Sequence, residues 1–152
     1  MKRALILVSS IICCLIILAG PAEAFHSIQN RGSGIVSLQA VDEDLPEQAH
    51  GLATFRLKRR ASGFYILTAK LKVSTLHKRA GRVFEAWLVD KESGYALSLG
   101  TFNTNSTGDC GFTVRRPITN LAQFNKIIVT SEKTDDFDPT PSGPVLLEGK
   151  KN

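Results

Sequence analysis

The stretch that decides the fold is residues 82–102, which read RVFEAWLVDKESGYALSLGTF. Two apolar runs, Val83–Val89 and Tyr95–Leu99, flank a short polar segment that contains Gly94. β-Branched and aromatic residues on both sides of a glycine-containing turn are typical of a β-hairpin. The first run holds Trp87, the only tryptophan, and is too continuously apolar for a strand with one face in solvent. We therefore expect a central strand that is covered on both faces.

Alternating apolar and polar residues predict further strands on both sides of this hairpin. The longest is Phe64–Val73, in which Leu67 and Leu71 share one face while Lys70 and Lys72 share the other. The other predicted strands are Ile35–Val41, Gly51–Lys58, a strand through Phe112 and Val114, Lys126–Glu132 and Pro144–Glu148.

The segment Pro117–Phe124 has a different spacing. Ile118, Leu121 and Phe124 recur at every third residue, which is compatible with a short helical turn. No long helix is indicated anywhere, and no helical crossovers separate the strands, so the strands are expected to pair mostly antiparallel. The fold class predicted is all-β: a mostly antiparallel two-sheet β-sandwich of immunoglobulin-like type with about eight strands, with a small barrel as the second choice. It would occupy residues 35–149, after a polar linker at 25–34 and before a tail at 150–152.

Residues 1–24 have the composition of a secretory signal peptide. An apolar run at residues 4–19 follows a basic start, and Ala22–Ala24 gives the small-x-small pattern of a cleavage site before Phe25. We expect cleavage after Ala24 and therefore an exported, extracytoplasmic protein. The apolar run has about 16 residues, fewer than the roughly 20 that span a bilayer. An uncleaved anchor, with membrane association through residues 4–19, stays open as the alternative.

The charge balance limits the kinds of binding partner that we expect. Lys2, Arg3 and Glu23 would leave with the signal, so the 128 remaining residues hold 17 basic and 13 acidic side chains, a net charge of +4. This balance is compatible with adhesion to anionic surfaces such as membranes or wall polymers, and with ordinary solubility, which we favour. The basic residues are spread out without an interleaved aromatic platform, and export fits poorly with nucleic-acid binding, so no nucleic-acid partner is expected.

Only one cysteine, Cys110, lies outside the signal, so the exported chain has no internal disulfide framework. A blue-copper site needs two histidines and a cysteine, usually with a methionine. No histidine follows Cys110 and Met1 is the only methionine, so the sequence does not predict a copper site. A nucleophilic role for Cys110 with His77 as base has no supporting motif, and a partly buried turn residue is the better interpretation.

Two runs of acidic residues suggest a calcium-binding site, but neither has the spacing of a calcium-binding loop. The runs are Asp42–Asp44 and the group Asp135, Asp136 and Asp138. Solvent-exposed loops explain both acidic runs better than calcium binding does. We find no nucleophile elbow, phosphate loop or metalloprotease motif, and we assign no catalytic, cofactor-binding or metal-ligating residue.

Two stretches carry a family resemblance. The first is Phe84–Asp90 followed by Gly94, Ser98–Phe102 and Gly108; the second is Val129–Glu132 followed by Pro139–Val145 and Gly149. In this order they resemble the C-terminal, extracytoplasmic domain of anti-sigma-K factors. The resemblance implies a sensor-type β-sandwich, and it implies no catalytic residues. No sigma-binding region precedes it, so the chain is not expected to hold a sigma factor itself.

Three hypotheses about function follow. The first is an exported, non-enzymatic binding or sensor-like module at the cell envelope, with an unknown envelope ligand or protein as its partner. The second is a membrane-tethered structural or assembly module, and the third is an enzyme or metal-binding protein that uses Cys110 and a histidine. Function on such folds usually lies on loops. The loops Thr101–Gly108 and Lys133–Gly143 are therefore the predicted binding surface.

Overall fold

The computed structural model describes residue 28, residues 32–136 and residues 138–149. The predicted signal peptide and tail, and most of the predicted linker, lie outside these residues. The described part holds eight strands, which confirms the all-β prediction. They are β1 (Ser33–Ala40), β2 (His50–Arg59), β3 (Tyr65–Ser74), β4 (Arg82–Val89), β5 (Ala96–Phe102), β6 (Cys110–Ile118), β7 (Lys126–Lys133) and β8 (Val145–Gly149). None of the described residues belongs to a helix long and apolar enough to cross a membrane.

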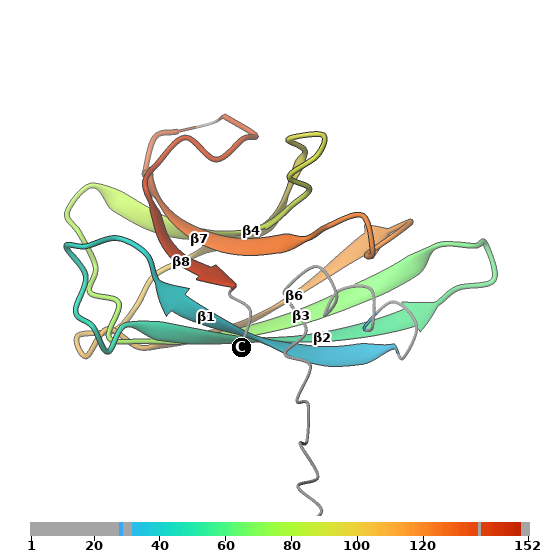
Figure 1. Cartoon of the computed structure of the whole chain (residues 1–152), viewed down its shortest axis with the longest axis horizontal. Coiled ribbons are helices and arrows are strands. Elements are labelled where there is room, and N and C mark those ends of the chain that lie inside the picture. The colour runs from blue at the N-terminus through green and yellow to red at the C-terminus, as the bar shows by residue number, and fades with distance from the viewer. Residues whose placement is uncertain (1–27, 29–31, 137, 150–152) are drawn as a thin grey trace, which may run out of the picture.

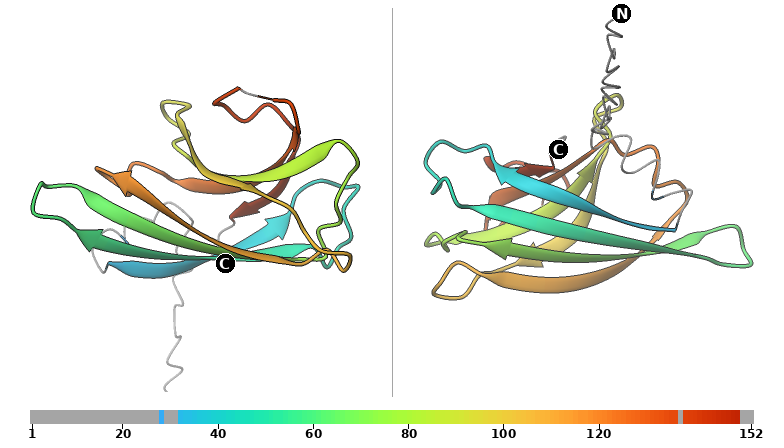
Figure 2. Two further views of the ribbon diagram at one scale, coloured as in Figure 1. Left: turned by 180° about the vertical axis from the view of Figure 1, so that it is seen from behind. Right: turned by 60° about the horizontal axis from the view of Figure 1, so that its bottom comes forward.

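All eight strands belong to one antiparallel sheet, in the order β5-β4-β7-β8-β1-β2-β3-β6. The sheet curls so that β4, β7 and β8 arch over β1, β2, β3 and β6 (Figure 1). Figure 2 shows the same curl from behind and after a tilt. The prediction of two separate sheets is not confirmed, because β8 pairs with β1 through Leu38–Gly149 and Ala40–Leu147 and joins the two layers. The second choice, a small barrel, describes this nearly closed sheet better.

The curl brings the two end strands, β5 and β6, close together without pairing their backbones. Aromatic side chains bridge this seam instead. The rings of Phe102 in β5 and Phe112 in β6 are stacked, with centroids 4.9 Å apart, and Phe84 in β4 lies 5.6 Å from Phe102. Aromatic pairs at such distances stabilise beyond the area that they bury. Side-chain packing rather than hydrogen bonding therefore closes the barrel.

The inside of the curl is the hydrophobic core. Side chains alternate along each strand, so one set from every strand points into it. The largest fully buried members are Phe55, Phe84, Phe124, Ile28, Leu38, Leu67, Leu76, Leu88, Leu99 and Leu121. All eight strands contribute to this one core, and the cysteine among the described residues, Cys110, is free.

Trp87 is buried on the other side of β4. Phe84, Ala86 and Leu88 face the core, and the alternation places Trp87 on the outer face, where it is only 1% exposed. Its Nε1–H donates a 2.9 Å hydrogen bond to Thr130 Oγ1 on the paired strand β7. The loops at 90–95 and 134–144 stand over this face (Figure 1). The expectation that β4 is covered on both faces is confirmed.

The helical turn expected at Pro117–Phe124 is wrong. Pro117 and Ile118 end strand β6, and residues 119–125 form an irregular turn. Ile118, Leu121 and Phe124 are all buried, so their spacing reflects three inward side chains on an extended end and the turn that follows it. A three-residue spacing over so short a segment does not distinguish this arrangement from a helix.

Candidate functional site

An apolar pocket of about 290 Å³ opens to solvent at one end of the β5–β6 seam. Its walls come from the end of β6 and the turn after it, from the start of β5, and from the residue before β3. The lining residues are Phe64, Tyr95, Leu97, Pro117, Ile118, Thr119, Gln123 and Phe124. None of them is a carboxylic acid, a basic residue or a thiol, so the pocket offers apolar contact surface with the polar groups of Tyr95, Thr119 and Gln123.

Two of the residues that line this pocket are exposed aromatic residues. Phe64 is 49% exposed and Tyr95 is 52% exposed, although both have large apolar rings. Behind them, Phe124 is buried, and its ring centroid lies 6.0 Å from that of Tyr95. Water-exposed aromatic surface next to a buried apolar floor favours the binding of a flat apolar or aromatic group.

The turn that carries Tyr95 is fixed by its own side chains. Asp90 accepts hydrogen bonds from the backbone N–H of Glu92 at 3.0 Å and from the Ser93 hydroxyl at 2.5 Å. The bond from Ser93, more than the one from Glu92, holds the pKa of Asp90 below its usual value. Gly94 has a φ of 73°, which a residue with a side chain rarely adopts, and Tyr95 follows it directly. The aromatic ring therefore stands on a preformed turn.

Asn125 ties this turn to the opposite wall of the pocket. Its side-chain Oδ1 accepts a 3.0 Å hydrogen bond from the backbone N–H of Lys91, and its backbone N–H donates a 3.1 Å hydrogen bond to the carbonyl of Val89. The turn before Asn125 is closed by Asn120, whose Oδ1 accepts from the N–H of Ala122 at 3.0 Å. The walls of the pocket are thus fixed before any ligand arrives.

The predicted binding loop Thr101–Gly108 is anchored to its neighbour. Thr104 is buried, and its hydroxyl donates to the carbonyl of Leu76 at 2.7 Å. Asn105 Oδ1 accepts from the N–H of Thr107 and of Asp109, and the Thr107 hydroxyl holds the pKa of Asp109 below its usual value. These bonds supply turn geometry, so the structure gives this loop a structural role.

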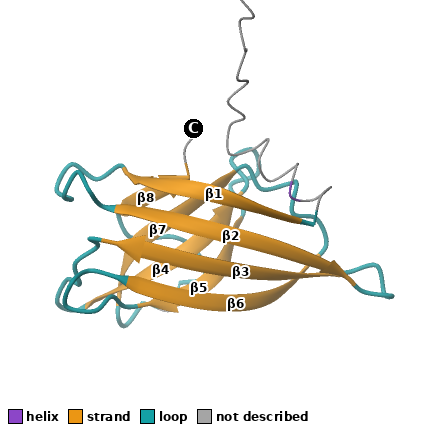
Figure 3. Cartoon of the chain, turned by 90° about the horizontal axis from the view of Figure 1, so that it is seen from below, coloured by secondary structure: helices purple, strands orange, loops and turns teal. Residues whose placement is uncertain are grey.

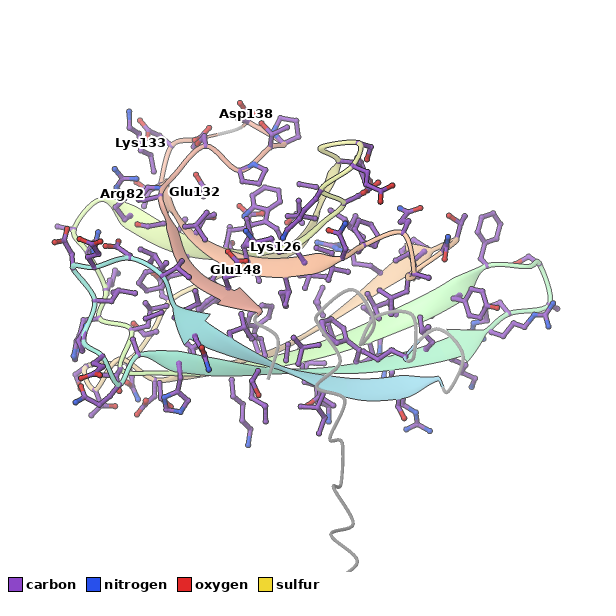
Figure 4. All side chains as sticks on the ribbon, in the orientation of Figure 1. Arg82, Lys126, Glu132, Lys133, Asp138 and Glu148 are labelled. Carbon is purple, nitrogen blue, oxygen red and sulfur yellow. The ribbon has the colours of Figure 1, made fainter. Side chains whose placement is uncertain are left out.

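The second predicted loop, Lys133–Gly143, folds back onto β7 (Figure 4). The carboxylate of Glu132, a residue only 4% exposed, accepts hydrogen bonds through Oε2 from the Ser142 hydroxyl at 2.9 Å and from the Gly143 N–H at 2.7 Å. The Ser131 N–H also donates to the carbonyl of Pro144 at 3.0 Å. The other oxygen, Glu132 Oε1, is buried and has no hydrogen-bond partner among the described residues. These bonds make this loop a clamped cover.

Acidic side chains of the loop and of the strands next to it interact with one another. Burial raises the pKa of Glu85, the Ser98 hydroxyl that donates to it acts in the opposite direction, and Glu132 and Asp136 raise it further. Even so, within the described ranges no three His, Cys, Asp or Glu side chains are placed to hold a metal ion. On the same outer face Lys126 and Glu148 form an ion pair (Figure 4).

Cys110 begins β6 and packs half-buried against the core. Burial raises the pKa of its thiol. A raised thiol pKa lowers the thiolate fraction at neutral pH, and this works against the hypothesis of a cysteine nucleophile.

A second hollow, of about 670 Å³, lies beside the β1–β2 loop. Asp42, Glu43 and Glu47 line it, and Asp42 is paired with Arg79 at 3.6 Å. It lacks exposed aromatic walls, so the seam pocket is the stronger candidate for a ligand site.

The seam pocket escaped the sequence analysis because its walls come from separate turns. One signal was present: Gly63–Phe64 and Gly94–Tyr95 each place an aromatic residue directly after a turn glycine with positive φ. An aromatic residue at such a point lies at the end of a strand and gains little from the core.

Comparison with known proteins adds no relative. No protein-family model matches the chain, and no curated protein or solved structure matches it. The resemblance to anti-sigma-K factor domains therefore stays a prediction.

Proposed function

We propose that this chain is an exported, non-enzymatic binding module of the cell envelope and that the seam pocket is its ligand site. The observation that carries the proposal is the pair of half-exposed aromatic rings, Phe64 and Tyr95, on an apolar pocket with fixed walls. Fixed walls reduce the ordering cost of binding, which favours a recognition site.

Export is supported by the signal-like composition of residues 1–24, and a sensor-like role by the resemblance to anti-sigma-K factor domains. In this proposal the two layers of the curled sheet correspond to the two sheets expected of a β-sandwich. The predominantly apolar pocket lining, which contains no carboxylate, basic side chain or thiol, supports binding rather than catalysis.

Titration with the fluorescent apolar probe anilinonaphthalene sulfonate tests the pocket. The parent protein is expected to bind the probe saturably, and the double variant F64S/Y95S is expected to lose this binding. The matched control is I35S, which removes an apolar side chain that is 61% exposed outside the pocket. Equal probe binding by all three proteins, each with an unchanged unfolding midpoint, would rule out the pocket as an apolar site.

N-terminal sequencing of the protein isolated from the host envelope tests export. Phe25 as the first residue supports the exported form. An intact residue 1 in the membrane fraction would instead support the alternative, a module tethered through residues 4–19.

A further inference from the structure

Four neighbouring strands carry positive charge with no negative charge among them. β1, β2, β3 and β6 contain no aspartate and no glutamate. They contain seven basic residues, which are Arg56, Lys58, Arg59, Lys70, Lys72, Arg115 and Arg116. The chain as a whole has 14 acidic residues, so this layer differs sharply from the rest.

The strand pairing places five of these cations on one face. Partners across a ladder share a face, and Arg56 pairs with Thr68, which pairs in turn with Arg115. Lys58 lies two residues from Arg56, and Lys70 and Lys72 lie two and four residues from Thr68. Their side chains therefore point to the same face as Arg56, away from the buried side chains of the core. All five are exposed. Figure 3 views the molecule from the side of this four-stranded layer.

The cations lie close together without opposite charges. Neighbouring strands are about 4.8 Å apart and alternate residues on one strand about 6.7 Å apart, so each cation lies within about one Debye length of another. Neither of the two ion pairs formed by the described residues includes any of the five. Their mutual repulsion is relieved when a negative surface covers the face.

Acidic residues mark where this face ends. Asp109 directly precedes β6 at the end of the layer where β2 begins with His50, and the acidic β1–β2 loop begins at Asp42 at the same end. At the other end Arg59, the last residue of β2, is followed by Arg60 in the β2–β3 turn. The face is therefore most positive toward the β2–β3 turn.

Two apolar side chains share the face with the cations. Ile35 is 61% exposed and pairs with Thr54, and Leu52 is 40% exposed and pairs with Lys72. Exposed aliphatic groups among lysines suit the boundary between lipid headgroups and acyl chains. A linear polyanion would use the charges but would gain nothing from these two residues, and the face has no aromatic platform for bases.

We propose that the outer face of β1, β2, β3 and β6 docks on a bilayer surface rich in anionic phospholipid, with the cations over the headgroups and Ile35 and Leu52 at the acyl boundary. This inference does not depend on the ligand pocket, which lies at the seam.

Co-sedimentation of the full chain with vesicles tests the proposal. The vesicles are pure phosphatidylcholine or equal parts phosphatidylcholine and phosphatidylglycerol. The triple variant K58Q/K70Q/K72Q is compared with the control K78Q/K91Q/K133Q, which removes the same charge from loops and from the end of β7. Residues 4–19 are present in every protein, so only the difference between variants reports the face.

The parent is expected to prefer the phosphatidylglycerol vesicles and to lose this preference in high salt. The face variant is expected to bind them about 100-fold more weakly, since each lysine contributes about tenfold or somewhat less near an anionic surface. The control is expected to stay near the parent. Equal losses in both triple variants, with unchanged urea midpoints, would overturn the proposal.

The variant I35S/L52S separates the membrane from a soluble polyanion. It is expected to weaken vesicle binding while leaving any binding to inorganic polyphosphate unchanged. Unaltered vesicle binding by I35S/L52S, together with tighter binding to polyphosphate than to vesicles, would replace the bilayer with a linear polyanion as the partner.

Discussion

Replacement of Gly143 by alanine tests the clamp that holds the β7–β8 loop. A Cβ at this position would lie 1.9 Å from the carbonyl oxygen of Ser131 and 2.9 Å from Glu132 Oε2. The φ of Gly143 is not in the left-handed region, so contact with its neighbours, and not its own backbone conformation, forbids a side chain. The alanine must move the loop by at least about 1 Å to reach an ordinary contact distance.

A shift of that size breaks two hydrogen bonds. The Gly143 N–H loses Glu132 Oε2, now at 2.7 Å, and the Ser131 N–H loses the carbonyl of Pro144, now at 3.0 Å. A bond to a charged group contributes about 1.5–3 kcal/mol and a neutral one about 0.5–1.5 kcal/mol. The expected loss is therefore about 2–4 kcal/mol of unfolding free energy, which lowers the urea midpoint by about 1–2 M.

Urea unfolding followed by tryptophan fluorescence measures the effect. Trp87 is the only tryptophan and is buried on the outer face of β4, over which this loop stands (Figure 1), so its emission also reports local release of the cover before the sheet unfolds. The control is G111A, where a Cβ would meet nothing closer than 3.9 Å. A midpoint for G143A equal to that of G111A and of the parent would refute the clamp.

Three further predictions follow from the packing and the charges. Folding raises the pKa of Glu85, so between its unfolded and its folded pKa the folded protein binds more protons than the unfolded one. The free energy of unfolding should therefore fall as the pH rises through this window. The variant E85Q should flatten this pH dependence when unfolding is measured at several pH values. The variant F102A removes the ring that stacks on Phe112 and should lower the free energy of unfolding by about 3–5 kcal/mol. Amide hydrogen exchange should increase most in β5. An unchanged exchange pattern along the sheet would contradict closure of the seam by side chains. T130V removes the acceptor of the Trp87 Nε1–H and should cost about 1–3 kcal/mol, whereas T130S should cost less, and equal thermal midpoints for the two variants would speak against that bond.

Local pattern located the strands well. The alternation in Phe64–Val73 became β3 at Tyr65–Ser74, because a side-chain period of two is a direct consequence of extended backbone. The continuous run around Trp87 correctly indicated a strand covered on both faces. These features are properties of each segment and its burial.

The sheet order and the site depend on contacts between distant segments, which no local pattern contains. The prediction of two sheets failed because β8 pairs with β1, and a five-residue strand gives no hint of its second neighbour. Phe64 and Tyr95 meet at one pocket only because the sheet curls. The clamp on the loop Lys133–Gly143 could not be predicted for a related reason, since Glu132 lies in a strand and its side chain reaches the loop.

The unpaired seam also bears on how the chain avoids joining to its own copies. β5 and β6 are edge strands, and exposed edges invite another chain to add a strand. β6 ends in Arg115-Arg116-Pro117, two charges and a residue that lacks an N–H, and β5 departs from regular register opposite Ala86 and Trp87. Charge, proline and irregular register are the features that blunt strand addition. The same unpaired seam that forms the pocket is thereby protected from strand addition by another copy of the chain.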